Sequence, residues 1–175
     1  MNIIKHWLFI PFVFGLAYLA YTWYKQPNFG NGAIATNFSA TTLKGESIEL
    51  EQFRGKIVLL YFWGSWCGPC RRSSPFLNEL KQKYGNAKFK TAEGFEIIIV
   101  GIETEQERWE NALSKDNLLW AHNVSSLKRF DDPIALTYGI KEIPSSFLID
   151  EKGTIVGVNT LSSHLIELLD ERVAK

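Results

Sequence analysis

The sequence predicts an α/β protein in which a parallel core is extended by an antiparallel hairpin and flanked by helices. Two continuous runs of β-branched and aromatic residues, 56–63 and 95–102, have the composition of strands covered on both faces. Helical spacing of apolar residues lies between them, and two short strands follow later in the chain. A length of 175 residues allows one such domain plus a short extension.

Composition narrows the function before any motif is considered. Apolar residues make up 46% and charged residues 22%, as in ordinary globular proteins, so the chain is not disordered throughout. Lys plus Arg and Asp plus Glu both number 19, so no basic field is present to attract nucleic acid. We expect no nucleic-acid partner. Two cysteines are too few for a disulfide-rich scaffold.

The first 25 residues are predicted to form a membrane anchor. Residues 7–23 contain no charged side chain, and a helix of that length rises about 26 Å, near the short end of what spans a bilayer. Aromatic residues at both ends suit the two interfaces. A cleaved secretory signal is the alternative, but cleavage after Ala20 would put bulky Tyr18 where a small residue is needed. A retained anchor with a cytoplasmic N-terminus is therefore favoured.

Residues 26–36 are predicted to be a linker, and residues 37–175 a single domain. The linker contains Gly, Asn and Pro without periodicity, which is typical of a flexible tether. The domain opens with alternating residues at 41–50 around a turn at Lys44–Gly45, which indicates a β-hairpin.

The remaining elements follow from periodicity and capping residues. Apolar residues at helical spacing predict helices at 75–84 and 105–113, and an Asp-Pro start followed by a Tyr-Gly end predicts a short helix at 133–138. Strands at 146–149 and 154–158 flank a turn, and a last helix begins after Ser162 or Ser163.

The chemistry is concentrated in Cys67-Gly68-Pro69-Cys70, directly after a buried strand and directly before a helix. Two intervening residues allow the sulfurs to meet, so the pair can cycle between dithiol and disulfide. The helix N-terminus stabilises a thiolate at Cys67, and Arg71 and Arg72 add positive charge in the next turn. We expect Cys67 to be the nucleophile and Cys70 the resolving thiol.

Two other interpretations of the cysteines are weaker. A purely structural disulfide across so short a loop would constrain the unfolded chain little. A zinc site needs more ligands, and the only histidines are His6, His122 and His164. Redox chemistry is favoured, and no metal or cofactor is expected.

Three separated motifs resemble a known family. VLLYFWGSWCGPC is similar to the active-site segment of thioredoxin-fold proteins. With NFSATTLKGESIELEQFRGK before it and YGIKEIPSSFLIDEKGTIV after it, the pattern resembles the membrane-tethered TlpA/ResA-like thiol-disulfide oxidoreductases over residues 37–173. The resemblance implies a thioredoxin-like fold, with a central mixed sheet flanked by helices and an N-terminal β-hairpin extension. Residues 111–126 look like the insert of these proteins.

The resemblance also assigns residues that support the cysteines. Trp66, Gly68 and Pro69 belong to the motif. Pro144 matches the proline held cis opposite the cysteines, and the backbone of Ile143 before it would pair with a bound substrate strand.

Two positions depart from the family pattern. Tyr61 stands where thioredoxins carry a buried acid, and Ser73 stands where many of this subfamily carry a glutamate. Both usual proton acceptors are therefore missing. Glu103, at the end of the second buried strand, is the candidate proton acceptor for the resolving thiol. A solvated strand-end glutamate is the alternative.

By resemblance, the chain reduces exposed disulfides of client proteins from the bacterial inner membrane. Its clients would be either apocytochrome c, whose haem-binding thiols it would restore, or a broader set of misoxidised proteins. Its catalytic domain would face the periplasm or cell exterior, and a transmembrane thiol electron donor would keep it reduced. A copper-handling or assembly factor on the same fold is the alternative. Such proteins usually separate their cysteines by three residues and add a histidine, which this sequence does not match.

Overall fold

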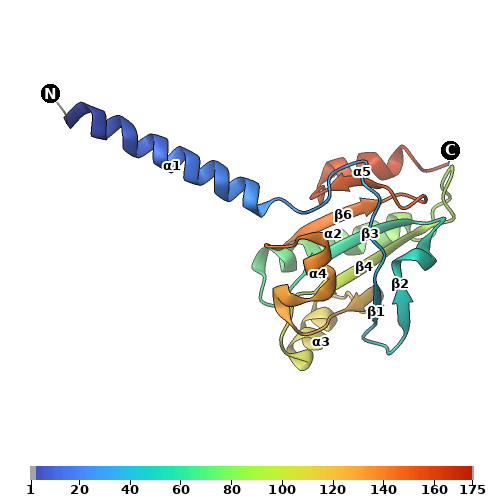
Figure 1. The fold of residues 1–175 in the computed structure, drawn as a ribbon. Coiled ribbons are helices and arrows are strands. Elements are labelled where there is room, and N and C mark those ends of the chain that lie inside the picture. Colours follow the sequence, from blue (N-terminus) through green and yellow to red (C-terminus); the bar gives the residue numbers. More distant parts are fainter. Residues whose placement is uncertain (1–2, 175) are drawn as a thin grey trace.

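The structure is a computed structural model that describes residues 3–174, with side chains from residue 11 onwards (Figure 1). Five helices and seven strands are described: α1 Ile3–Lys25, β1 Ser39–Thr41, β2 Ser47–Glu49, β3 Ile57–Trp63, α2 Gly68–Tyr84, β4 Phe95–Gly101, α3 Gln106–Lys115, β5 His122–Val124, α4 Pro133–Tyr138, β6 Ser145–Ile149, β7 Ile155–Val158 and α5 Ser163–Asp170. Two short 3-10 turns, Leu50–Phe53 and Arg129–Asp131, complete the elements.

The central sheet has five strands in the order β5-β4-β3-β6-β7. β4 pairs in parallel with β3 and with β5, whereas β6 is antiparallel to both β3 and β7. The predicted parallel core with an antiparallel extension is confirmed. The first hairpin forms a separate two-stranded sheet, in which Ser39 lies opposite Glu49.

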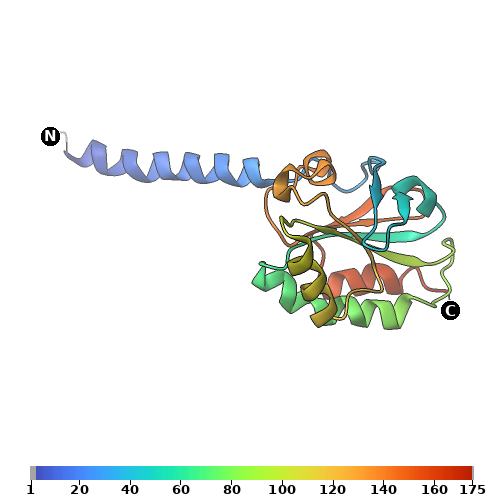
Figure 2. The ribbon, with the colours of Figure 1, turned by 90° about the horizontal axis from the view of Figure 1, so that it is seen from below.

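β3 is the centre of the fold because all seven of its residues are buried. Ile57, Leu59 and Tyr61 face a layer made by α2, α3 and α5, whereas Val58 and Leu60 face the opposite layer of α4 and the first hairpin. Figure 2 shows these two layers on either side of the sheet. α2 leaves the carboxyl end of β3, so the motif lies at the edge of a rigid, two-sided core.

α1 extends away from the domain as one continuous helix (Figures 1 and 2). Its last turn contacts the domain: Lys25 forms an ion pair with Glu142, and the ammonium of Lys141 donates to the Tyr24 carbonyl and lies 3.8 Å from the centre of its ring. Within the part of the chain that the structure describes, no helix meets the length and apolarity needed to cross a membrane. The predicted anchor at 1–25 includes residues 1–2 and the side chains of residues 3–10, which lie outside the described part.

Residues 26–36, predicted to be a flexible linker, are instead docked on the domain over most of their length. The Gly32 N–H donates to the Ile155 carbonyl at 2.8 Å, Ile155 donates back to Ala33 at 2.8 Å, and Ala35 donates to Gly153 at 2.9 Å. β7 is the edge strand of the sheet, and its unpaired backbone groups bind the passing chain. The packed domain therefore begins before residue 37.

The sequence prediction also lacked one strand. β5 lies inside residues 111–126, the region that the resemblance identified as an insert, and it extends the sheet beyond β4. With three residues it is too short to show a pattern of its own. The first hairpin, the last hairpin and the helix that follows Ser162 are confirmed.

Glu96 on β4 gives the fold a defined response to acid. The neighbouring His122 and, more weakly, Lys56 lower the pKa of Glu96 from 4.5 to about 2. Because this pKa is depressed in the folded state, its stabilisation is present above pH 4.5 and is lost as the pH falls towards 2. Glu96→Gln should therefore lower the free energy of unfolding at pH 5 and have little effect near pH 2, as measured by urea denaturation. Glu79→Gln on the exposed face of α2 is the control, and an equal loss at both pH values would contradict the prediction.

Candidate active site

The motif is built around the first turn of α2. Cys67 is the N-cap residue in an extended conformation, and its sulfur accepts a hydrogen bond from the Cys70 N–H at 3.2 Å. Pro69 lies in the first turn, where its missing N–H costs nothing. A sulfur at this position replaces the side-chain oxygen of an ordinary N-cap, so a thiolate at Cys67 would gain the hydrogen bond and the helix dipole.

Cys67 and Cys70 form a disulfide, with 5.2 Å between their Cα atoms. Cys67 is 4% exposed and Cys70 is fully buried, so of the two residues only Cys67 reaches the surface. The carbonyl oxygen of Ile143 lies 3.7 Å from the Cys67 sulfur. The Ile143–Pro144 peptide bond is cis, as the resemblance implies, and Pro144 is exposed.

Trp66 and Ile143 form the wall around Cys67, and both pack over Gly64. The Trp66 indole N–H donates to the Ile102 carbonyl at 2.7 Å, which fixes the ring, while the side chain stays 38% exposed. A Cβ on Gly64 would lie 2.9 Å from Ile143 Cδ1 and 3.0 Å from Trp66 Nε1. Because Gly64 has no side chain, the side chains of Trp66 and Ile143 can approach each other beside Cys67.

Gly64→Ala should consequently disturb the site more than the fold. We expect a loss of about 1–2 kcal/mol in the free energy of unfolding, because the added methyl group overpacks a fixed indole. We also expect a severalfold slower reduction of a client disulfide. Urea denaturation measures the free energy of unfolding, and the thiols released from the client in acid-quenched samples measure the rate of reduction. Gly94→Ala, which would meet no atom within 4 Å, is the matched control, and equal effects of the two changes would contradict the prediction.

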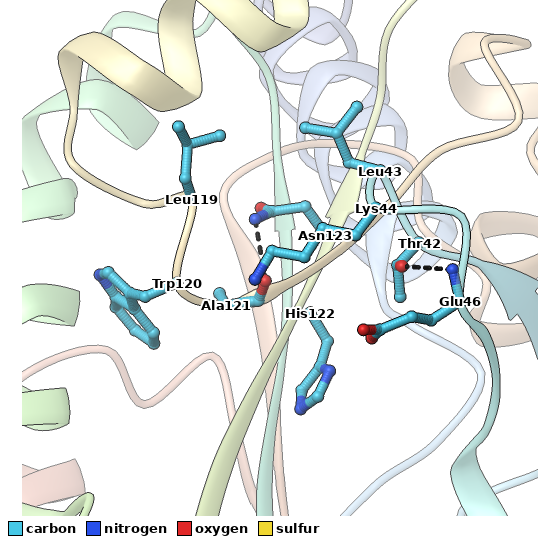
Figure 3. A pocket seen from close by; sticks show the side chains of 9 residues that line it. All are labelled: Thr42, Leu43, Lys44, Glu46, Leu119, Trp120, Ala121, His122 and Asn123. Atoms are coloured by element: carbon cyan, nitrogen blue, oxygen red, sulfur yellow. Dashed lines mark hydrogen bonds between the residues drawn. The ribbon is translucent and has the colours of Figure 1, made fainter.

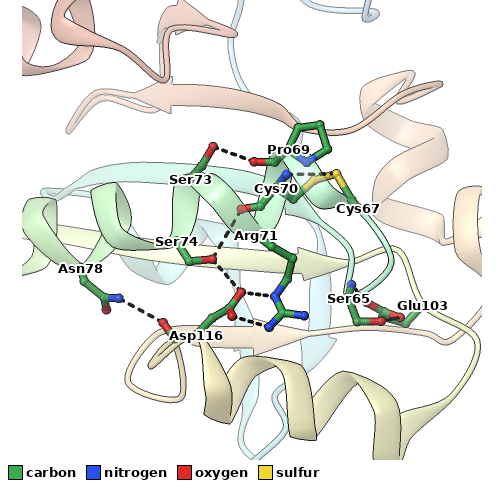
Figure 4. A network of polar contacts seen from close by, with 10 residues as sticks. All are labelled: Ser65, Cys67, Pro69, Cys70, Arg71, Ser73, Ser74, Asn78, Glu103 and Asp116. Atoms are coloured by element: carbon green, nitrogen blue, oxygen red, sulfur yellow. Dashed lines mark hydrogen bonds and ion pairs between the residues drawn. A yellow bond between two sulfur atoms is a disulfide. The ribbon is translucent and has the colours of Figure 1, made fainter.

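Glu103 is buried with 2% exposure, so the alternative of a solvated strand-end glutamate is wrong. Its carboxylate accepts hydrogen bonds from the Ser65 backbone N–H and, at 2.9 Å, from the Ser65 hydroxyl (Figure 4). Burial raises the pKa of the Glu103 carboxyl, although the hydrogen bonds from Ser65 oppose the shift. Glu103 thus holds the loop that leads to Cys67, and its role as proton acceptor for Cys70 stays a prediction.

Tyr61 and Ser73, the two departures from the family pattern, carry hydroxyl groups where the resemblance implies carboxylates. Tyr61 is fully buried in the layer that contains both cysteines, and its hydroxyl has no hydrogen-bond partner in the described part of the chain. Burial raises the pKa of Tyr61 to about 12, so the phenol is neutral at ordinary pH. The Ser73 hydroxyl donates to the Pro69 carbonyl at 3.1 Å. Neither side chain replaces a carboxylate as a base.

A polar network below the motif was not predicted from the sequence. Asp116, at the end of α3, binds Arg71 through both carboxylate oxygens and accepts the Ser74 hydroxyl at 2.9 Å (Figure 4). Its backbone carbonyl accepts the Asn78 amide at 3.1 Å. Arg71 is therefore neutralised by an ion pair, which corrects the expectation that it adds free positive charge beside Cys67. No local sequence signal links residues 71 and 116.

Trp120 and His122, both within the segment 111–126, are held in place by neighbouring residues of the domain. The Trp120 indole donates to the Asn78 side chain at 2.7 Å, and His122 packs edge-on against Phe53 with ring centres 5.1 Å apart. Both line a cavity of about 260 Å³ between the first hairpin and β5, to which the motif contributes no residue (Figure 3). Among the described residues, no group of three or more His, Cys, Asp and Glu side chains could hold a metal ion.

These features define a class of protein. A reversible Cys-X-X-Cys pair at a helix N-terminus, with one accessible sulfur and a backbone carbonyl beside it, is the site of a thiol-disulfide oxidoreductase.

Comparisons with known proteins agree with this class. A family model described as thioredoxin-like matches residues 55–155. The thiol-disulfide oxidoreductase ResA of Bacillus thuringiensis subsp. konkukian is 35% identical over 132 residues, which is 75% of this chain and 70% of that protein. The ResA of Geobacillus thermodenitrificans is 31% identical over 83% of this chain and 80% of that protein. The thioredoxin domain of a thiol-disulfide oxidoreductase from Bacteroides vulgatus has a TM-score of 0.72 and 27% identity, covering 82% of this chain and 98% of that one.

The chain belongs to the thioredoxin-like family and is a thiol-disulfide oxidoreductase of the ResA type. The fold and the enzyme class implied by the motifs are thereby confirmed.

Proposed function

We propose that the chain is a membrane-tethered reductase of disulfides in exported proteins. The observation that carries this proposal is the Cys67–Cys70 disulfide at the N-terminus of α2, in which only Cys67 retains exposure. A client disulfide can approach that sulfur along the carbonyl of Ile143. Backbone pairing of this kind needs no particular client sequence.

The reaction transfers two electrons in two exchange steps. The Cys67 thiolate attacks one sulfur of the client disulfide, which forms a mixed disulfide and releases the other client sulfur as a thiolate. Cys70 then loses its proton and attacks Cys67, which re-forms the Cys67–Cys70 disulfide and releases the second client thiol. The client gains two electrons, and the enzyme loses them.

The location follows from the N-terminal sequence. Residues 7–23 carry no charge, and the similar ResA proteins come from bacteria. We place the anchor in the bacterial cytoplasmic membrane and the domain in the periplasm or cell exterior. An oxidising compartment does not return electrons to the pair, so a transmembrane thiol donor restores the dithiol. The clients include apocytochrome c, whose haem-binding thiols must be reduced.

The redox state of the pair in the cell tests the direction. Acid quenching followed by alkylation should find Cys67 and Cys70 mostly reduced in the native host, and mostly oxidised when the electron donor is removed. A pair that is oxidised in both cases would reverse the proposed direction. Fractionation tests the tether separately, because the full chain should sediment with membranes and should resist extraction by high salt.

A further inference from the structure

A guanidinium group is fixed beside the accessible sulfur. Arg129 lies over the ring of Trp66, with 4.7 Å between its guanidinium carbon and the ring centre. Trp66 directly precedes Cys67, and its ring is fixed by the hydrogen bond to Ile102. Phe130 packs edge-on against the same ring at 6.2 Å. The charge of Arg129 therefore has a defined position at the mouth of the site.

The backbone that presents Arg129 has an unusual conformation. Arg129 and Leu127 both have left-handed φ angles, 51° and 59°, which residues with a Cβ disfavour. The loop is held at both ends, since the Leu127 N–H donates to the Ser125 hydroxyl at 3.1 Å and the Ser126 N–H donates to buried Asp132 at 3.0 Å. The Arg129 N–H also donates to the Glu103 carbonyl at 3.0 Å. Such backbone is retained where the surrounding structure enforces it, often at functional sites.

A second guanidinium lies next to the motif. Arg72 is exposed, and its Nη1 lies 3.4 Å from the position that a Cβ on Gly68 would occupy. In the described part of the chain, neither Arg72 nor Arg129 has a carboxylate within 4 Å, in contrast to Arg71 with its partner Asp116. In the described part of the chain, two cations without a direct ion pair thus lie beside the motif, although the charge of Arg129 also acts on the buried Glu103 carboxyl and the domain as a whole carries almost no net charge.

We propose that Arg72 and Arg129 form a recognition site for clients whose disulfide is flanked by acidic side chains. This inference rests on the proposed reductase function and names its substrate class. A carboxylate near the attacked cysteine would bind a planar guanidinium through two hydrogen bonds, while the client backbone approaches Ile143. A client with lysine at the same position would instead be repelled.

The test uses two peptides with the same disulfide loop, one with aspartate and one with lysine on each side of the cysteines. The full chain, reduced and held in a non-ionic detergent, should reduce the aspartate peptide about tenfold faster than the lysine peptide, as measured by kcat/KM. The ratio should fall towards 1 at 0.5 M salt. It should also fall to about 3 in Arg129→Gln, approach 1 in the double variant with Arg72→Gln, and invert in Arg129→Glu.

The ratio separates recognition from chemistry, because any effect of the arginines on the Cys67 thiolate changes both rates equally. Lys44→Gln, which removes an exposed cation from the first hairpin, should leave the ratio unchanged. Equal reduction of the two peptides by the unaltered chain would overturn this inference and leave the proposed function standing. Reduction of neither peptide would overturn the proposed function, and this inference with it.

Discussion

Replacing Cys70 with serine should reduce multiple-turnover disulfide reduction to background and leave the client attached to Cys67. Cys67 retains exposure and the N-cap position, so the first exchange step can still occur. The buried Cys70 is the only thiol in the chain that can resolve the mixed disulfide. Non-reducing electrophoresis and mass spectrometry should find complexes that a reductant releases.

Cys67→Ser is the matched control for that experiment. It should also abolish turnover, but it should capture no client, because Cys70 has no exposed surface from which to attack. Equal capture by the two variants would contradict the assignment of nucleophile and resolving thiol.

Asp116→Ala should produce the largest loss of stability among single changes near the site. The substitution removes the two-oxygen contact with Arg71 and the nearer of two acceptors for the hydroxyl of Ser74, which is 2% exposed. The Asp116 side chain is only 10% exposed, so water cannot fully replace it. We expect the free energy of unfolding to fall by about 2–3 kcal/mol, as measured by urea denaturation.

Two comparisons identify the cause of that loss. Asp116→Asn keeps an acceptor oxygen for the network and should cost less than the alanine change. Glu51→Ala removes an exposed ion pair with Arg54 and should have a much smaller effect. A loss in Asp116→Ala no greater than that in Glu51→Ala would show that the network does not hold α3 against α2.

Local patterns were sufficient for much of the fold and for the centre of the site. β3 and β4 were predicted because nearly every residue of these strands is apolar, with Glu96 the exception in β4, and α4 because Asp132 and Pro133 specify its start. The motif predicted the helix N-terminus at Cys67 by chemistry and spacing alone. In each case the information lies within a few neighbouring residues.

The features that sequence analysis missed depend on contacts between distant residues. Asp116 binds Arg71 across 45 positions, and Glu103 reaches Ser65 across 38. The sequence left open whether Glu103 is a site residue or a solvated one, because its burial is produced by elements that no local pattern brings together. The position of Arg129 over Trp66 likewise depends on a loop with left-handed residues, for which Leu and Arg give no sequence signal.

The docked segment at 28–35 limits how far the disulfide can travel from α1. A freely flexible chain from Gln26 to Thr36 would separate its ends by roughly 18 Å on average and let the domain rotate in every direction. With that segment paired to β7, and with Lys141 and Glu142 bound to the last turn of α1, almost no free chain remains. Ile143 follows these two residues and its carbonyl oxygen lies 3.7 Å from the Cys67 sulfur, so the disulfide stays at the end of the domain next to α1. A redox partner beside α1 would therefore meet this disulfide at a high effective concentration, whereas a partner at the far end of the domain would be out of its reach.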